Sequence, residues 1–172
     1  MNNNKQQISQ SKNTLTEIFR YEVEAGVSEY HVMIHATAPE ATYEEQLTAV
    51  VDAYYKLRES ELSGAVAVFK RYFLSDAANQ ESTLLALTTE SSDCALSIVE
   101  QPPLNGTKTA LWAYLQTNVQ TRVLHNGLFE VKHGTYRHLW GGSAFNRAAN
   151  SEYQTRLLLN DYVMQLMEQG CK

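Results

Sequence analysis

The sequence predicts an α+β protein in which a mixed sheet carries helices on one face. Two observations lead to this prediction. Segments with the two-residue alternation of a strand are interleaved with segments that have the apolar spacing of a helix. Capping residues precede the helical segments, and glycine or proline interrupts the pattern between elements. The resulting order is ββαβαββ over residues 14–117, followed by ββα over residues 118–172.

The first two strands are predicted at residues 14–24 and 29–37, with a turn at Ala25-Gly26. Alternation on the second strand places His31, Met33 and His35 on one face and Tyr30, Val32 and Ile34 on the other. Thr42 and Glu45 form a capping box that starts a helix running to about residue 60. That helix carries one apolar stripe, formed by Leu47, Val50, Val51, Tyr54 and Leu57.

Ser63-Gly64 ends the first helix, and the most continuous strand follows at residues 65–74, as expected of a central strand. Lys70 and Arg71 alternate on it, so one of them could anchor an anion in a cleft, or both could be solvated. Ser75 or Asp76 is expected to cap a second helix over residues 75–90. Strands at 93–100 and 108–116 complete the unit, separated by a loop that contains Pro102-Pro103 and Asn105-Gly106.

Residues 21–57 recur in altered form at residues 129–165, at a constant offset of 108 positions and without a gap. The identical pairs include Glu22/Glu130, Val23/Val131, Gly26/Gly134, Ala36/Ala144, Glu44/Glu152, Gln46/Gln154 and Tyr54/Tyr162. The recurrence favours a duplicated ββα unit.

The second copy begins with a tight hairpin predicted at His125-Asn126-Gly127. A turn at His133-Gly134, a strand at 136–140 and a helix at 151–169 with Asn150 as its cap are expected to follow. The apolar stripe of that helix should be buried on the first unit or on a neighbouring chain; its members are Leu158, Leu159, Tyr162 and Leu166.

Composition excludes several classes of function. The formal net charge of −5 argues against a nucleic-acid-binding protein, which needs a basic face. Two cysteines far apart in the chain predict neither a disulfide framework nor a zinc site, and no cofactor is expected. Residues 1–13 are polar and are expected to form a disordered leader, and no apolar run reaches the ~18 residues of a membrane span. We therefore expect a soluble cytoplasmic protein.

Three segments resemble the RidA/YjgF family, whose members are also described as L-PSP endoribonuclease-like proteins or translation-initiation inhibitors. They are FKRYFLSDAANQ at 69–80, EQPPLNG at 100–106 leading into TALWAYL at 109–115, and the helix that contains Gln46 and ends at Gly64. The resemblance covers residues 15–116 and recurs over 121–172. It implies a chorismate-mutase-like unit that assembles as a trimer or pseudo-trimer. In this family, clefts between subunits bind small carboxylates, and the best understood activity is hydrolysis of enamines and imines to keto acids and ammonia.

The usual charged pair of that family does not match this sequence. The position of its carboxylate-binding Arg falls at Asp93 or Cys94, and its Glu falls on Leu111 or Trp112. Residues 72–120 contain no arginine. The usual deaminase site is therefore expected to be missing.

Six residues remain as candidate ligand-binding residues, and each has a structural alternative. Cys94 could be a reactive thiol or a buried strand residue, and His35 could be a proton shuttle or a surface histidine. Trp112, with Tyr114 on the same strand face, could line a pocket or pack in the core or at an oligomer contact. Asn79 could belong to a turn or a pocket. Arg71 is the possible anion anchor named above, and Gly142 lies where the family has a Ser-Gly pair whose backbone meets the ligand.

The expected function is therefore that of a RidA-like protein that binds a keto or imino acid, and any activity would be hydrolysis of the enamine or imine type. A second hypothesis is a non-catalytic structural or interaction copy within a tandem RidA-like protein. A third is a chorismatase-like or endoribonuclease-type hydrolase on the same fold.

Overall fold

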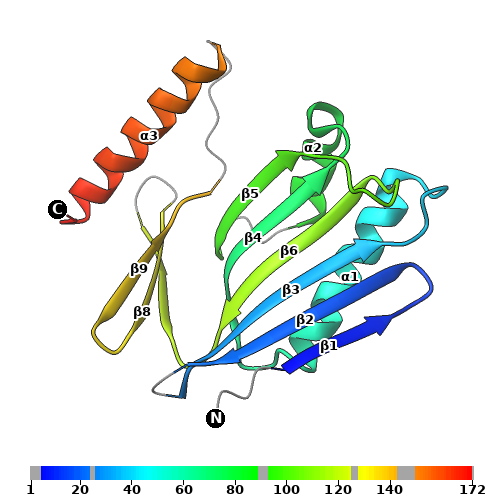
Figure 1. The fold of residues 1–172 in the computed structure, drawn as a ribbon, viewed down its shortest axis with the longest axis horizontal. Coiled ribbons are helices and arrows are strands. Elements are labelled where there is room, and N and C mark those ends of the chain that lie inside the picture. Colours follow the sequence, from blue (N-terminus) through cyan, green and yellow to red (C-terminus); the bar gives the residue numbers. More distant parts are fainter. Residues whose placement is uncertain (1–4, 24–25, 89–92, 125–127, 143–149, 172) are drawn as a thin grey trace.

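The computed structural model describes residues 5–23, 26–88, 93–124, 128–142 and 150–171, and within them it has two sheets and three helices (Figure 1). The α+β class predicted from the sequence is confirmed. The larger sheet has the order β1-β2-β3-β6-β4-β5, with β1 at Lys5–Gln10, β2 at Thr14–Glu22, β3 at Ser28–Ala36, β6 at Thr109–Gln116, β4 at Val66–Leu74 and β5 at Ala95–Glu100. The smaller sheet has the order β7-β8-β9, with β7 at Gln120–Val123, β8 at Phe129–His133 and β9 at Tyr136–Trp140.

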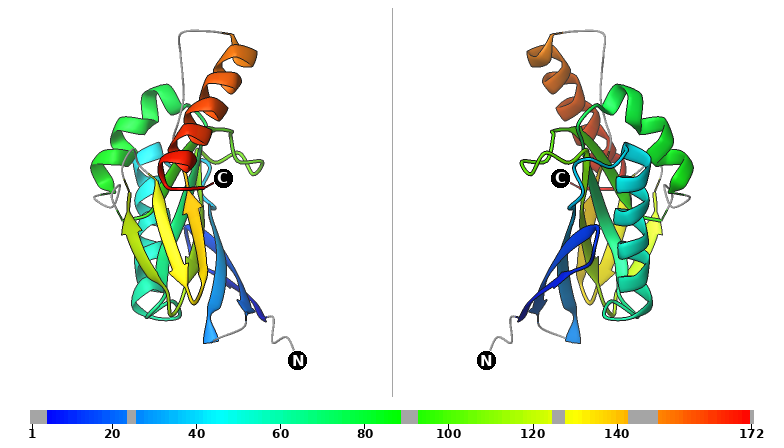
Figure 2. Two further views of the ribbon diagram at one scale, coloured as in Figure 1. Left: turned by 90° about the vertical axis from the view of Figure 1, so that its left-hand side faces the viewer. Right: turned by 90° about the vertical axis from the view of Figure 1, so that its right-hand side faces the viewer.

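The larger sheet is mixed, because β4 and β5 pair in parallel whereas its other neighbouring strands pair antiparallel. Two helices, α1 at Tyr43–Glu59 and α2 at Ala77–Leu87, cover one face of this sheet (Figure 2). The main core lies between them and the sheet, and β3 contributes Val32 and Ile34 to it, both fully buried. His31, Met33 and His35 therefore face the side without helices, as the alternation predicted.

Helix α1 begins where the sequence predicts, because its capping box forms. The Thr42 hydroxyl accepts a hydrogen bond from the Glu45 amide at 3.2 Å, and the Thr42 amide donates to the Glu45 carboxylate at 2.9 Å. The predicted stripe is buried together with two further residues of the first turn; the buried set is Tyr43, Gln46, Leu47, Val50, Val51, Tyr54 and Leu57. Burial of this stripe holds the helix on the sheet.

The two basic residues of strand β4 lie on opposite faces of the larger sheet. Lys70 is buried on the helix side, with its ammonium 4.5 Å from the centre of the Tyr54 ring. Arg71 points to the opposite face, where its guanidinium lies over the rings of Phe69 and Trp112. The side of the sheet without helices thus carries an arginine among aromatic rings.

The expected disordered leader is corrected over part of its length, since Lys5–Gln10 form strand β1. Each residue of β1 pairs antiparallel with β2, from Lys5 opposite Arg20 to Gln10 opposite Leu15. The segment has little apolar content, but the open edge of β2 supplies backbone partners, and a turn between Ser11 and Thr14 joins the two strands. The composition of residues 5–10 does not predict that the edge of another strand is available for pairing.

The second half has the two predicted strands and the predicted helix, adds strand β7, and packs differently from the first half. Helix α3, at Ser151–Glu168, begins 108 positions after α1, and Asn150 caps it as Thr42 caps α1. The hairpins differ, however: Glu22 pairs with Ser28 across a loop of five residues, whereas His133 pairs with Tyr136 across two. The predicted hairpin at 125–127 lies outside the described residues.

The apolar stripe of α3 is not buried within this chain, which corrects the expectation that it packs on the first unit. No residue of α3 is buried, and Leu159 is 60% exposed. The reason is that the apolar face of β8 and β9 is covered by the larger sheet. On this face, Phe129, Val131 and Trp140 pack with Phe69 and Tyr114. That face is then no longer open to α3, which stands at the outer side of β9 (Figure 1). Packing on a neighbouring chain stays a prediction.

Within the described residues, no helix has both the length and the apolar character needed to cross a membrane.

Candidate functional site

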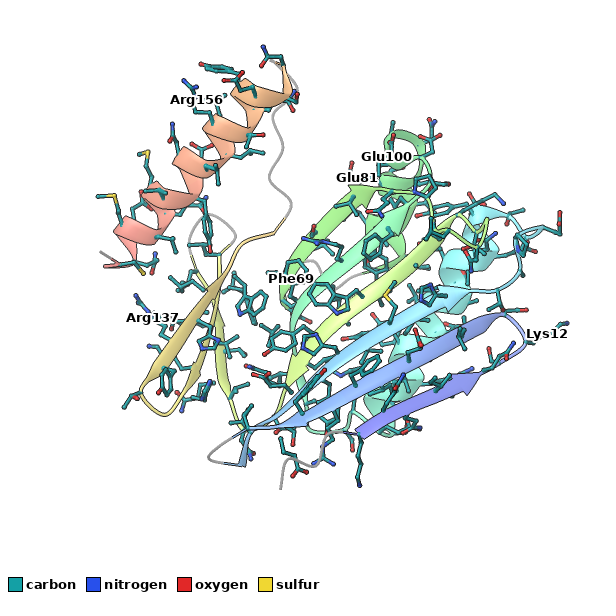
Figure 3. The ribbon with its side chains drawn as sticks, in the orientation of Figure 1. Lys12, Phe69, Glu81, Glu100, Arg137 and Arg156 are labelled. Atoms are coloured by element: carbon teal, nitrogen blue, oxygen red, sulfur yellow. The ribbon has the colours of Figure 1, made fainter. Side chains whose placement is uncertain are left out.

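A cleft of about 1210 Å³ lies where the two sheets and α3 meet. One wall is formed by β4 and β5, a second by the end of β9, and a third by α3. The lining residues are Arg71, Cys94, Leu96, Ser97, Ile98, Val99, His138, Leu139, Trp140, Gly141, Gly142, Leu158, Leu159, Asp161, Tyr162 and Gln165. Figure 3 shows Phe69 on the side of the larger sheet that faces β8 and β9. The cleft thus combines apolar walls with a few charged groups, as small-molecule sites do.

Among the described residues that line this cleft, Arg71 carries the positive charge. Its Nε donates to the Ser97 hydroxyl at 3.2 Å on the neighbouring strand, and its guanidinium carbon lies 5.3 Å from the centre of the Phe69 ring and 5.9 Å from that of Trp112. These contacts fix the guanidinium plane. Among the described residues, neither terminal amino group of Arg71 has a hydrogen-bond partner. A fixed guanidinium with both amino groups available is the geometry that binds a carboxylate in two parallel hydrogen bonds.

Aromatic rings form the surface beside Arg71. Trp112 pairs with Arg71 across β6 and β4, and its ring stacks on His31 with centroids 5.9 Å apart and planes at 9°. Burial lowers the pKa of His31 below its ordinary value, against a smaller opposing effect from Glu29. His31 is therefore a neutral ring at pH 7 and part of the aromatic surface, and not a second cation for an anionic ligand.

Glycine at position 142 allows β9 to approach the edge of β5. A Cβ atom on Gly142 would come within 2.6 Å of the backbone nitrogen of Leu96 and would overlap its carbonyl oxygen too. The neighbouring Gly141 is different, because a Cβ atom there would meet the side chain of Tyr162 at 3.2 Å. Gly142 thus closes one end of the cleft by contact between two backbones.

Replacing Gly142 with alanine is expected to lower the free energy of unfolding by about 1–3 kcal/mol, because a backbone has to move to make room. Urea denaturation followed by circular dichroism measures the change. Gly141→Ala is the matched control and should cost less, since the Tyr162 ring can rotate away. Equal losses in the two variants would contradict the contact between Gly142 and Leu96.

Four of the six candidate residues predicted from the sequence come together. Arg71, Cys94 and Gly142 line the cleft, and the Trp112 ring contacts the Arg71 guanidinium. Cys94 is buried and also packs in the main core, so its thiol is held inside the sheet edge.

The other two candidates lie elsewhere. Asn79 belongs to the first turn of α2, where its amide and side chain both donate to Asp76, which caps that helix. His35 lines a separate, mainly apolar pocket of about 480 Å³ on the open face, and its Nε2 lies 3.9 Å from Glu17. Neither residue reaches the cleft around Arg71.

Three residues that line the cleft were not among the six candidates predicted from the sequence. Trp140 and His138 alternate on β9, which places them on one face, and Tyr162 lies in the apolar stripe of α3. Their spacing indicates strand and helix faces, but not which surfaces those faces meet.

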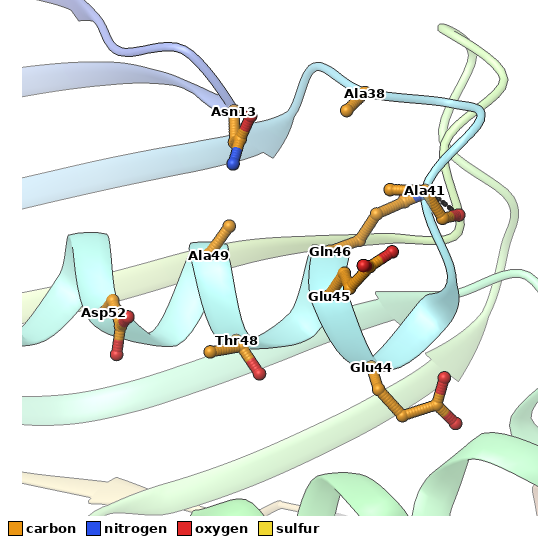
Figure 4. A pocket seen from close by; sticks show the side chains of 9 residues that line it. All are labelled: Asn13, Ala38, Ala41, Glu44, Glu45, Gln46, Thr48, Ala49 and Asp52. Atoms are coloured by element: carbon orange, nitrogen blue, oxygen red, sulfur yellow. Dashed lines mark hydrogen bonds between the residues drawn. The ribbon is translucent and has the colours of Figure 1, made fainter.

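Another pocket, of about 500 Å³, surrounds the start of α1 (Figure 4). Its polar groups serve the fold: the Glu45 carboxylate completes the capping box, and the Gln46 side chain donates to the Ala41 carbonyl at 3.0 Å and accepts from the Lys108 amide at 2.7 Å. The remaining acidic side chains, Glu44 and Asp52, would repel a carboxylate. This pocket therefore fits the proposed type of ligand less well than the cleft.

A charged cluster lies on the outer face of the smaller sheet. Its centre is Glu130, whose side chain is 1% exposed and lies 2.7 Å from Arg122, 3.1 Å from Lys132 and 3.5 Å from Arg137. Burial raises the pKa of Glu130, but hydrogen bonds from Arg122 and Lys132 outweigh it and hold that pKa below its usual range. Arg137 also donates to the Gln169 carbonyl at 2.8 Å and so connects the cluster to the end of α3. The three cations serve this carboxylate, so the cluster is structural.

The described residues contain no group of three or more His, Cys, Asp or Glu side chains that could hold a metal ion. Comparison with family models, with curated proteins and with solved structures found no match.

Proposed function

We propose that this chain is a RidA-like protein that binds a small keto or imino acid in the cleft between β5, β9 and α3. The observation that carries the proposal is Arg71, a guanidinium fixed by Ser97 and two aromatic rings with both amino groups available in the cleft. The resemblance places the family's arginine at Asp93 or Cys94, and Cys94 lines the same cleft as Arg71.

Binding is proposed ahead of catalysis. Hydrolysis of an imine adds water across the C=N bond and releases ammonia from the resulting carbinolamine, and this requires a group that transfers protons near the carbon. His138 and Asp161 are the cleft residues with suitable chemistry. A cytoplasmic location and assembly as a trimer or pseudo-trimer belong to the same proposal.

Replacing Arg71 with methionine is expected to weaken the binding of pyruvate about 10- to 100-fold, because charge-assisted hydrogen bonds to a carboxylate are lost. Isothermal titration calorimetry measures the change. Arg71→Lys should restore part of the affinity, since a point charge remains without the two parallel bonds.

Arg156→Met is the matched control, because Arg156 is an exposed arginine on α3 that pairs with Glu152. It should bind pyruvate like the unmodified protein. Unchanged affinity in Arg71→Met would overturn the proposed site. Release of ammonia from imines of amino acids would separate a hydrolase from a binding protein.

A non-catalytic interaction copy is the second candidate. The feature that favours it is the exposed side of α3, where Leu159, Val163, Met164 and Met167 are each more than half exposed. Such a stripe is unusual for a helix in a protein that acts alone. In this case the protein would bind no keto acid, and the calorimetric titration of the unmodified protein would show no heat of binding.

A further inference from the structure

We propose that the cleft prefers a keto acid with an aromatic side chain over a short aliphatic one, and that Trp140 and Tyr162 set this preference. The inference rests on the proposed function, because it takes Arg71 as the carboxylate anchor. It adds the class of ligand and the residues that select it.

The first argument is the position of Trp140 relative to Arg71. Both lie against the same ring: the Arg71 guanidinium is 5.3 Å from the centre of Phe69, and the Trp140 ring is 5.6 Å from it. Phe69 thus contacts both the anion anchor and the indole. A ligand whose carboxylate pairs with Arg71 therefore has its body next to an indole, against which a flat apolar group packs best.

The second argument is the opposite wall. Tyr162 of α3 packs on the backbone of Gly141, and its hydroxyl donates to the Leu139 carbonyl at 3.5 Å. This contact holds the Tyr162 ring at the mouth of the cleft, where it lines the cleft together with Trp140. Leu96, Ile98 and Leu158 add apolar surface. A ligand body between these walls exchanges water for aromatic and aliphatic carbon.

The third argument is size. The cleft volume of about 1210 Å³ is at or above the ~300–1,000 Å³ that encloses ligands of drug size, so pyruvate would leave most of it to water. Among the described lining residues, the charged one besides Arg71 is Asp161, which disfavours a second carboxylate on the ligand. An uncharged ring fits the remaining space better than a second acidic group.

The test compares 3-phenylpyruvate with pyruvate by isothermal titration calorimetry on the whole chain. We expect 3-phenylpyruvate to bind about tenfold more tightly, a difference that ring stacking and burial of a phenyl group supply. Trp140→Leu should weaken the binding of 3-phenylpyruvate more than that of pyruvate and so remove this difference. Tyr162→Ala should reduce the difference without affecting folding, since no residue of α3 is buried.

Tyr136→Ala is the matched control for Tyr162→Ala, because Tyr136 is a tyrosine on β9 that is 66% exposed and does not line the cleft. If Trp140→Leu fails to fold by circular dichroism, Tyr162→Ala decides the question alone. If the two acids bind with equal affinity and this affinity falls in Arg71→Met, the inference is overturned and the proposed function stands. A preference for 3-phenylpyruvate that survives in both Trp140→Leu and Tyr162→Ala would also overturn it. No binding of either acid would overturn both.

Discussion

Replacing Glu130 with glutamine is expected to lower the free energy of unfolding by about 2–3 kcal/mol. The side chain is 1% exposed and is surrounded by Arg122, Lys132 and Arg137, so a neutral amide would leave three cations facing one another. Removal of one member of a buried charge pair costs about 3–5 kcal/mol, and the expected loss is smaller here because the cations are partly exposed. Guanidinium denaturation is unsuitable because it screens charge, so urea denaturation measures the effect.

Glu22 provides the control for this prediction, because it occupies the corresponding position 108 residues earlier. Its side chain is 42% exposed and pairs with Arg20 at 3.1 Å. An exposed pair of this kind contributes about 0–1 kcal/mol, so Glu22→Gln should change stability little. A loss in Glu22→Gln as large as that in Glu130→Gln would show that burial of the cluster is not the cause.

The pH dependence of stability should change in the same variant. The folded-state pKa of Glu130 lies below the ordinary value of 4.5, so the unfolded chain binds more protons than the folded chain between these two pKa values. The stabilising effect of Glu130 is therefore complete above the unfolded pKa and is lost as the pH falls through the folded pKa. In Glu130→Gln, the decline of stability on acidification below about pH 5 should be shallower. An unchanged slope would mean that the carboxylate does not titrate abnormally.

Replacing Gln46 with leucine should cost about 2–3 kcal/mol, since its buried amide joins the start of α1 to the start of β6. Gln46 is 2% exposed, and its loss would leave the Lys108 amide, now 2.7 Å from the Gln46 carbonyl, without that acceptor. Differential scanning calorimetry measures the change in melting temperature. Gln6→Leu, on the exposed strand β1, should stay within about 0.5 kcal/mol of the unmodified protein. An unchanged melting temperature in Gln46→Leu would indicate that water replaces these hydrogen bonds.

Local signals in the sequence were sufficient for the helix starts. Thr42 and Asn150 each place an oxygen where a helix amide needs an acceptor, and both caps form. Strands β2 to β6 and β9 are found within a few residues, because their alternation reflects one buried face. These features depend on neighbours in sequence, so they can be predicted without knowing the tertiary structure.

The orientation of β4 could not be predicted in this way. A bulge between Ala67 and Phe69 shifts the pairing with β6, so Ala67 packs on the helix side while both Val68 and Phe69 face the other side. After this shift, Arg71 reaches the open face and Lys70 the core. Simple alternation does not reveal a bulge, and both basic residues therefore remained possible anion anchors.

The surroundings of α3 were the largest departure from expectation. An apolar stripe on a helix predicts that this face of the helix is buried, but it does not predict which other surface packs against it. The apolar face of β8 and β9 meets Phe69 and Tyr114 of the larger sheet, and α3 is left at the outer side of the cleft. The cleft arises from this non-local packing, which is why Trp140 and Tyr162 were not foreseen as neighbours of Arg71.

The position of β6 also determines when this chain can fold during synthesis. β6, at Thr109–Gln116, lies between β3 and β4, so two neighbouring strands must wait for a segment made more than 70 residues after β3. Until that segment leaves the ribosome, the β2–β3 hairpin and the β4–β5 pair each expose a bare edge. Nascent chains that end just before Thr109 should therefore be the ones that most need a chaperone.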